Sequence, residues 1–346
     1  FERSYGTLNR YYRVVDSLTP ADLQAAARKY LVDDSLIVTT LSHDALPGGI
    51  DKLPKLAQFA PAASNAKFDV LVQKSALPQI RFKLLFGAGS AHDPQGKEGL
   101  AALTAAMVAS SGSRERKIDE VTKDLFPLAG SFTEQTDKEM TTFTGTIHKD
   151  NWEEYLGIAM PLLVDPGFRE EDFRRLKDAQ RNALVLDLKD NNEEEFGKER
   201  LQTNVFAGTP YGHPVLGTVA GIDAITLDDV KAFYHRAYTQ GAVRVGISGD
   251  VSDAMSASLQ KSLARLPQGA GLSATAVPRG RMPNGLEVEI VEKNTRATAI
   301  SFGLPLDVTR KHPDFAALWI AKTWLGEHRA SSARLYQRIR EERGMN

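Results

Sequence analysis

The sequence predicts an α+β fold made of two-layer units, in which helices cover a mostly antiparallel sheet, with a repeat about every 210 residues. Three observations lead to this prediction. Two patterns of helices and strands recur in the same order along the chain. The predicted strands come in hairpin-like pairs, and the helices are grouped between those pairs rather than alternating with single strands.

The first repeated pattern is a capped helix followed by a strand. Thr19 opens a helix whose first turn carries the acid Asp22, as is typical of a helix start. This helix leads to the apolar residues 36–38. The same order recurs at Thr226, 207 residues later, and leads to an apolar stretch at 243–245.

The second repeated pattern is a pair of strands followed by a helix. It begins at Val70 and again at Val288, an offset of 218 residues. The later copy predicts strands at 288–293 and 297–302 and a helix from Pro313. Either pattern alone would be a weak signal because such elements are common, but two in the same order at similar spacing favour one repeated unit.

The repeat divides the chain into three parts. Residues 1–52 are predicted to be the tail of a preceding unit, 66–266 a complete unit, and 278–346 the truncated start of the next unit. Segments rich in proline and alanine, at 53–64 and 267–283, separate them. Both ends of the chain are therefore expected to lie inside structural units.

The elements of the complete unit follow from hydrophobic periodicity and from helix caps. Alternating polar and apolar residues predict strands at 68–74, 80–87, 131–137, 140–148 and 242–248. Longer amphipathic segments predict helices at 98–110, 115–127, 150–163, 170–189, 193–206 and 227–238. The predicted sheet is therefore mostly antiparallel, with the helices between its strand pairs.

The composition excludes several classes of protein. The 346 residues include 43 Lys+Arg and 44 Asp+Glu, a net charge of −1, so nothing global favours nucleic acid or another polyanion as a partner. No apolar run approaches the roughly 18 residues of a membrane span. The absence of cysteine excludes disulfides, thiolate zinc sites, iron–sulfur clusters and cysteine nucleophiles.

Local motifs give no independent catalytic site. The closest pair among the seven histidines, His312 and His328, is 16 residues apart, which is not a local metal-binding spacing. His213 precedes Pro214 in a predicted turn that explains it without chemistry. The acids 193–195 would attract a cation, but an acidic first helix turn is the ordinary interpretation. No phosphate-binding loop, dinucleotide fingerprint or nucleophile elbow is present.

One run of residues resembles a known family. The segment 93–101, Asp-Pro-Gln-Gly-Lys-Glu-Gly-Leu-Ala, follows a strand that ends in Gly-Ala-Gly-Ser at 87–90. It resembles the pitrilysin/insulinase superfamily of zinc peptidases, the inverzincins, and the resemblance covers essentially the whole chain. In that family the helix that begins here carries His-x-x-Glu-His. Its two histidines bind zinc from one helix face, and its glutamate deprotonates the zinc-bound water.

By this resemblance the zinc motif is degenerate. Ala102 and Ala106 stand where the family has its histidines, and Ala105 stands where it has the glutamate. The family's remaining ligand is a glutamate some seventy residues further on, but segment 173–183 contains no glutamate, and its only acid is Asp178. Alanine cannot ligate a metal or move a proton, so no zinc hydrolysis is expected in this unit.

The closing segment resembles the opening of the family's second type of domain. There an arginine, followed seven residues later by a tyrosine, faces the zinc site from the other half and holds the substrate backbone. The pattern assigns that role to Arg340, and the tyrosine would follow directly after Asn346. The alternative is that Arg340 is one more exposed charge in the predicted charged helix 331–343.

The resemblance therefore implies a catalytically inactive, peptidase-like half that supplies a substrate-holding surface to a zinc-bearing peptidase half, fused upstream or separate. This chain is expected to bind no cofactor, with zinc in the partner half and a peptide as substrate. The alternative is a purely structural or peptide-binding scaffold with no role in proteolysis. Related bacterial proteins often work in the periplasm or elsewhere outside the cytoplasm, although the residues themselves do not set the compartment.

Overall fold

The computed structural model describes residues 5–30, 32, 68–295, 298–326 and 330–345. The chain divides into two compact units, Phe1–Asn65 and Ala66–Asn346. The first unit contains the helices α1 (Tyr5–Ser17) and α2 (Pro20–Tyr30). The apolar stretch expected at 36–38 and the linker expected at 53–64 lie outside the described residues.

The second unit is built on a five-stranded sheet with the strand order β1-β5-β2-β4-β3. β1 pairs with β5 in parallel, and the other three pairings are antiparallel. The strands are β1 (Val70–Lys74), β2 (Gln79–Phe86), β3 (Ser131–Thr136), β4 (Thr141–His148) and β5 (Val243–Gly249). The predicted α+β fold with a mostly antiparallel sheet is confirmed.

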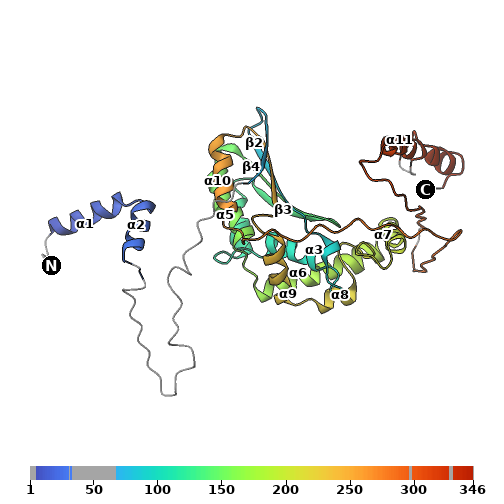
Figure 1. The fold of residues 1–346 in the computed structure, drawn as a ribbon, viewed down its shortest axis with the longest axis horizontal. Helices are drawn as coiled ribbons and strands as arrows, with labels where there is room; N and C mark the ends of the chain where they lie inside the picture. Colours follow the sequence, from blue (N-terminus) through green and yellow to red (C-terminus); the bar gives the residue numbers. More distant parts are fainter. Residues whose placement is uncertain (1–4, 31, 33–67, 296–297, 327–329, 346) are drawn as a thin grey trace, which may run out of the picture. The chain divides into compact units, whose positions relative to one another are not determined.

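Helices fill the chain between the strand pairs and after the last strand (Figure 1). Within the described residues they are α3 (Leu100–Ser110), α4 (Ile118–Leu125), α5 (Trp152–Val164), α6 (Glu170–Asn182), α7 (Glu193–Val205), α8 (Val219–Ala224), α9 (Leu227–Ala237), α10 (Asp253–Leu263) and α11 (Phe315–Leu325). None of these described helices is long and apolar enough to cross a membrane.

Alternation along the strands places the core on one face of the sheet. Ile80, Phe82, Leu84 and Phe86 of β2 are fully buried, whereas the residues between them are exposed or partly exposed. Successive side chains of a strand point to opposite faces, so the helices cover only the face that carries the apolar set. Aromatic rings interlock there, with Phe82 lying edge-on to Trp152 at 5.9 Å between ring centroids.

The other side of the sheet is called the open face below. Its residues follow from the strand register and the burial pattern. They are Leu71, Gln73, Gln79, Arg81, Lys83, Leu85, Ser131, Thr133, Gln135, Thr142, Thr144, Thr146, His148, Arg244, Gly246 and Ser248. Every strand thus contributes one polar or weakly apolar row to this face.

The two copies of the capped helix have the same local structure. At α9, the Thr226 amide donates to Asp229 Oδ2 at 2.9 Å, and the Asp229 amide donates to Thr226 Oγ1 at 3.3 Å. At α2, Thr19 and Asp22 make the same two hydrogen bonds at 2.9 and 3.3 Å. Both are capping boxes, which satisfy amides that a helix start leaves without partners. The spacing of the repeat itself stays a prediction.

Three features differ from the sequence-based expectation. The helix predicted at 170–189 is α-helical only to Asn182 and continues as a π-helix at Ala183–Asp190. The predicted C-terminal helix is described as a π-helix at Tyr336–Glu341. Helices α8 and α10 were not predicted, although Ser252 caps α10 by accepting from the Met255 amide at 3.2 Å.

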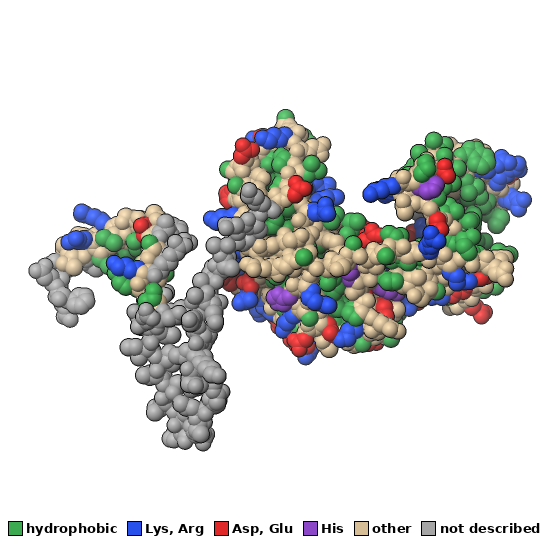
Figure 2. Space-filling view, in the orientation of Figure 1, with side chains coloured by type: hydrophobic (Ala, Val, Ile, Leu, Met, Phe, Trp, Pro, Cys, Tyr) green, Lys and Arg blue, Asp and Glu red, His purple; other side chains and the backbone are tan. Residues whose placement is uncertain are grey.

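The strands predicted at 288–293 and 297–302 are not formed in the described part of these segments. Their apolar side chains are exposed, with Ile290 at 86% and Ile300 at 80% of full exposure. A strand needs a neighbouring strand for its backbone hydrogen bonds. In the described residues, the five-stranded sheet does not include these two segments. The helix predicted from Pro313 is present as α11, whose hydrophobic residues lie largely at the surface (Figure 2).

Gly145 provides a test of the packing between β4 and the aromatic core. A Cβ atom at this position would clash with the Phe82 ring and the Tyr155 hydroxyl group. We expect Gly145→Ala to lower the free energy of unfolding by about 1–3 kcal/mol, measured by urea denaturation. Gly246→Ala is the matched control, because a Cβ there meets open space. Equal stability of the two variants would contradict this packing.

Candidate functional site

The alanines that the sequence placed at the degenerate zinc motif lie together on α3. Ala105 is fully buried, whereas Ala102 and Ala106 are partly exposed and lie one helical turn apart. The helix is regular from Leu100 to Ser110 and packs against β3, α6 and α9. Helix α3 is therefore complete at the three predicted motif positions, each of which carries only a methyl group, and the correspondence to a zinc motif stays a prediction.

The start of α3 is capped from outside the helix by Asp93. Its Oδ2 accepts a hydrogen bond from the Gly99 amide and its Oδ1 from the Ala101 amide, both at 2.7 Å. Gly99 has a φ of 107°, a left-handed conformation that favours glycine. Burial raises the pKa of Asp93 to about 7, although the two amide hydrogen bonds act in the opposite direction.

The loop before α3 is tied to two further helix starts. Lys97 Nζ lies 2.5 Å from Oδ1 of Asp229, the acid of the α9 capping box. Thr218, which caps α8, contacts Glu98 Oε2 through its hydroxyl group at 3.3 Å. Because each bond joins segments more than 100 residues apart in the sequence, the loop holds three helix N-termini in one place.

Gln180 connects α6 to the same place. Its side-chain amide donates to the carbonyl oxygen atoms of Gly99 at 2.9 Å and Leu216 at 2.8 Å, and the residue is 7% exposed. Gln180 lies in the segment 173–183, where the family's third ligand would fall. Sequence reasoning missed it because an amide side chain is not among the expected ligands of zinc. The acid of that segment, Asp178, is exposed.

The described residues hold no cluster of three or more His, Asp or Glu side chains that could bind a metal ion. His213 is half-buried, and its Nδ1 lies 2.9 Å from the Pro214 carbonyl oxygen. Burial lowers the pKa of His213. The residues around α3 thus do not fit a catalytic zinc ion, because they offer methyl groups where such an ion needs nitrogen or oxygen ligands.

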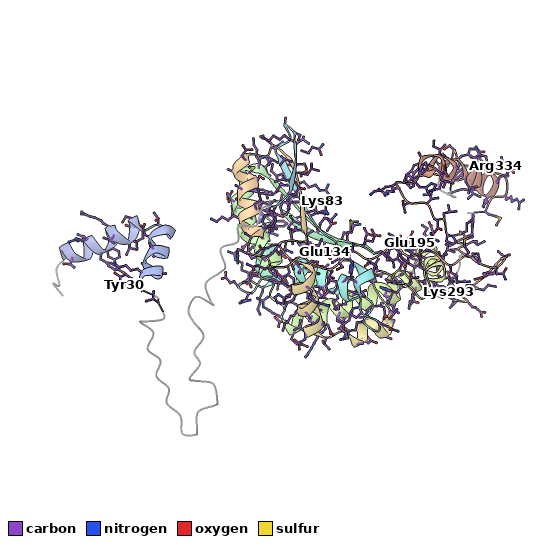
Figure 3. The ribbon with its side chains drawn as sticks, viewed as in Figure 1. Tyr30, Lys83, Glu134, Glu195, Lys293 and Arg334 are labelled. Carbon is purple, nitrogen blue, oxygen red and sulfur yellow. The ribbon has the colours of Figure 1, made fainter. Side chains whose placement is uncertain are left out.

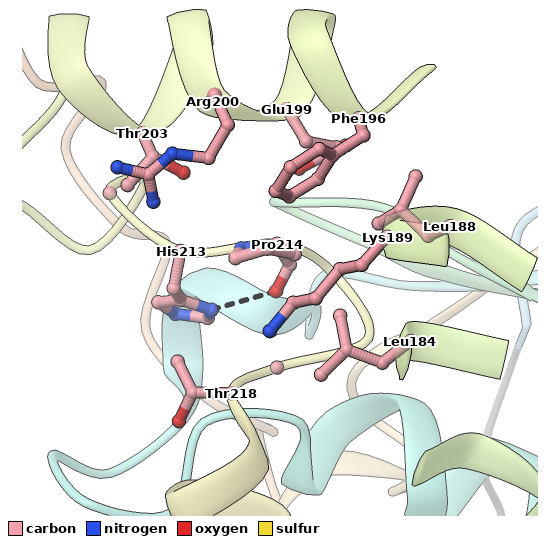
Figure 4. Close-up of a pocket in the computed structure, with 12 residues that line it drawn as sticks. Leu184, Leu188, Lys189, Phe196, Glu199, Arg200, Thr203, His213, Pro214 and Thr218 are labelled. Carbon is pink, nitrogen blue, oxygen red and sulfur yellow. Dashed lines mark hydrogen bonds between the residues drawn. The ribbon is translucent and has the colours of Figure 1, made fainter. Parts of the chain in front are cut away.

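A small pocket lies beside the loop that contains His213 (Figure 4). It has a volume of about 130 Å³ and is lined by Leu184, Leu188, Lys189, Phe196, Glu199, Arg200, Thr203, Gly212, His213, Pro214, Gly217 and Thr218. Arg200 is paired with Glu289 at 2.6 Å, and burial raises the pKa of Glu199. This volume is below the usual range of small-molecule sites, so the pocket is suited at most to a single side chain.

The acids 193–195 form hydrogen bonds and ion pairs in the first turn of α7, as expected for an acidic helix start. Asn192 caps α7 by accepting from the Glu195 amide at 3.1 Å. Glu193 accepts from the Thr295 hydroxyl group at 2.6 Å and pairs with Lys293 at 3.3 Å. Glu194 and Glu195 both pair with Lys198, at 2.8 and 2.7 Å.

Arg340 is exposed and lies on the π-helix near the end of the described chain. Its guanidinium group is 5.5 Å from the centre of the Tyr336 ring, one turn earlier. Its neighbour Arg338 pairs with Glu342 at 2.8 Å. Arg340 is therefore oriented by a ring contact, and its role toward a substrate stays a prediction.

Comparisons with known proteins identify the class to which this fold and site belong. Residues 70–219 match the family model for insulinase (peptidase family M16), and residues 224–345 match the model for the peptidase M16 inactive domain. The chain belongs to the peptidase M16 family. The resemblance predicted from segment 93–101 is confirmed.

Two curated relatives match most of the chain. It is 26% identical over 284 residues to the non-peptidase homolog YmxG of Helicobacter pylori, covering 82% of this chain and 64% of that protein. It is 24% identical to an uncharacterized zinc protease of Streptomyces coelicolor, covering 68% of this chain and 51% of that protein. The chain thus spans about half to two thirds of the length of these curated relatives.

Solved structures share the fold. The peptidase M16 inactive domain from Pseudomonas fluorescens superposes with a TM-score of 0.67 at 24% identity, covering 81% of this chain and 67% of that one. Pitrilysin superposes with a TM-score of 0.53 at 17% identity, covering 62% of this chain and 23% of that one. Together with the family models, these findings define an inactive peptidase M16-like domain.

The raised pKa of Asp93 gives a prediction about pH. An unfolded aspartate titrates near pH 4, so the folded state binds one more proton than the unfolded state between about pH 4 and 7. The stability that this proton contributes is present at low pH and is lost as the pH rises through about 7. The free energy of unfolding of the wild type minus that of Asp93→Asn should therefore fall over this range, by at most about 1.4 kcal/mol per pH unit.

Urea denaturation of both proteins at several pH values measures this difference. Because the other titratable groups are shared, their contributions cancel in the subtraction. A difference that stays constant between pH 4 and 8 would show that Asp93 titrates normally.

Proposed function

We propose that this chain is the zinc-free half of a peptidase M16 assembly, in which it supplies a substrate-holding surface to a zinc-bearing half. The observation that carries the proposal is the combination of an intact α3 with alanine at positions 102, 105 and 106. A helix kept in its packed position without ligands retains the shape of the family's site but not its chemistry.

The contacts at the start of α3 support the loss of the metal. The side-chain amide nitrogen of Gln180 donates two hydrogen bonds, both to backbone oxygen atoms. A neutral amide in that place is a structural tie between α6, α3 and the loop at Leu216, and it brings no negative charge toward a cation. Gln180 therefore serves the packing of α6 against α3 rather than the binding of a metal ion.

The exposed apolar residues of the first unit support the presence of a neighbouring half. Leu23 of α2 is 60% exposed, whereas its counterpart in the repeat, Val230 of α9, is fully buried. Tyr11, Tyr12 and Tyr30 are also exposed. A helical pair with an uncovered apolar surface is expected to pack against another element, so we assign residues 1–52 to the tail of a preceding peptidase-like unit.

Arg340 is the residue proposed to hold the peptide. A guanidinium group offers a fixed set of donors that suits a peptide carbonyl oxygen or a developing oxyanion. The contact with Tyr336 restricts the side chain before a ligand arrives, which lowers the entropy lost on binding. Arg338, on the same helix, is already paired with Glu342 and is not assigned this role.

The second candidate function is a peptide-binding scaffold without any part in proteolysis. The observation that favours it is the position of β3 at the end of the sheet, where its outer edge has no strand partner among the described residues. Such an edge can pair with an extended peptide through backbone hydrogen bonds. This function would need neither a zinc-bearing half nor Arg340.

Metal analysis tests the loss of the zinc site. The purified chain should hold no stoichiometric zinc by elemental analysis. The double variant Ala102→His with Ala106→His should bind zinc at least about tenfold more tightly than the single variant Ala102→His, because two histidines one turn apart on a helix can share a metal ion. Equimolar zinc in the wild-type chain would overturn the proposal.

Reconstitution tests the role in proteolysis. A peptidase M16 half with His-x-x-Glu-His should cleave a peptide faster when this chain is added. Arg340→Ala should lower kcat/KM in that mixture by about 10–100-fold, whereas the control Arg338→Ala should change it less than about twofold. If turnover is the same with and without this chain, the scaffold function is favoured instead.

A further inference from the structure

The open face of the sheet carries a group of cations that form no ion pair with the described residues. Arg81 and Lys83 lie two residues apart on β2, and Arg244 lies on the adjacent β5, directly opposite Leu85. All three side chains are exposed, and the strand register places them on the same face. Lys83 is labelled in Figure 3. Alternate residues of a strand are about 7 Å apart, so the three positive charges repel one another.

No acid among the described strand residues of this face neutralises them, because these residues include no Asp or Glu. Within the described part of the chain, the side chains of Arg81, Lys83 and Arg244 form no hydrogen bond or ion pair. Asp250, which follows β5, is paired with Lys149 at 2.6 Å. The cations are therefore available to an external anion.

A shallow groove lies beside two of these cations, Arg81 and Lys83. It has a volume of about 210 Å³ and is lined by Leu71, Gln73, Arg81, Lys83, Gly246, Ile247 and Ser248. Gly246 forms part of the floor, and nothing lies within 4 Å of the place where its Cβ would be. Leu71, 77% exposed, adds an apolar contact beside the charges. This space suits the methylene groups and the carboxylate of an acidic side chain.

Strand β4, next to β2, adds hydroxyl groups beside the cations. Thr144 pairs with Lys83 and Thr146 with Arg81, so their hydroxyl groups flank the cations on the side of β4. Hydroxyl groups donate and accept hydrogen bonds and so match the backbone and side chains of a polypeptide. The described strand residues of this face carry no aromatic side chain of Phe, Tyr or Trp on which a nucleotide base could stack.

We propose that the open face, centred on Arg81, Lys83 and Arg244, is a docking surface for an acidic polypeptide segment. Charge complementarity selects the occupant: several carboxylates along one segment can meet the three cations at once. The inference deepens the proposed function by naming the chemistry of the peptide, and it rests on that function only for the expectation that the ligand is a polypeptide.

Binding by the full chain alone tests this proposal. A fluorescein-labelled oligoglutamate peptide should bind, as measured by anisotropy at low ionic strength, and oligoglutamine of the same length should not. The triple variant Arg81→Gln, Lys83→Gln, Arg244→Gln should bind oligoglutamate about tenfold more weakly. Binding should also weaken when the salt is raised to about 0.5 M.

A matched variant controls for net charge. Lys123→Gln, Lys261→Gln, Arg265→Gln removes three exposed cations from outside the sheet and should bind like the wild type. A charge-reversed variant, Arg81→Glu, Lys83→Glu, Arg244→Glu, should instead prefer oligolysine. Thermal unfolding of each variant confirms that the fold is kept, as expected for exposed positions.

Three results would overturn the proposal: equal affinity of the wild type and the triple glutamine variant, equal affinity for oligoglutamine and oligoglutamate, or tighter binding of a single-stranded oligonucleotide through the same three residues. The assay contains no zinc-bearing half, so its failure is separate from a failure of the reconstitution. If Arg340→Ala leaves kcat/KM unchanged in the reconstitution, the proposed binding of oligoglutamate to the open face is likewise unaffected.

Discussion

The hydrogen bonds that hold the start of α3 are the constraint on which the rest of the site depends. Asp93 caps two amides of the helix, and Gln180 reaches a third group, the Gly99 carbonyl oxygen, from α6. Lys97 adds a link to the cap of α9. Unpaired polar groups in a packed interior are costly, so these bonds fix the position of the helix.

This constraint explains how a peptidase fold persists without peptidase chemistry. Helix α3 packs against β3, α6 and α9, and its alanines include Ala101 and Ala105, which are fully buried. Their small side chains keep the interior close-packed, and the helix remains regular. The features proposed to contact a peptide all lie at the surface: the outer edge of β3, the open face of the sheet, and Arg340. These are separate features, and each can fail alone.

Several large apolar residues lie at the surface of the molecule. Ile290, Ile300 and the tryptophans of α11 are exposed, and so is Leu23 of the first unit. By the predicted repeat, Leu23 and Ile300 correspond to Val230 and Phe82, which are both fully buried. Apolar residues exposed in this way are expected to pack against another element.

Local patterns in the sequence determined most of the elements. Alternation in β2 and the Thr226 cap of α9 each act over a few residues, and the structure confirms them. The same reasoning missed α8 and α10, and it was wrong about the strands predicted at 288–293 and 297–302, whose formation depends on partners distant in the sequence. The assignment of Ala102, Ala105 and Ala106 to a degenerate motif was possible from the sequence because such a motif spans about one helix turn, and it stays a prediction.

Other features were decided only by the tertiary structure. The tie between Gln180 and Gly99 joins residues 81 positions apart, and the pKa of Asp93 depends on how deeply the packed loop buries it. The cations of the open face come together because β5, nearly 160 residues after β2, inserts beside it in a set register. Composition and short patterns record residue types and local periodicity, whereas burial and long-range pairing exist only after the chain has folded.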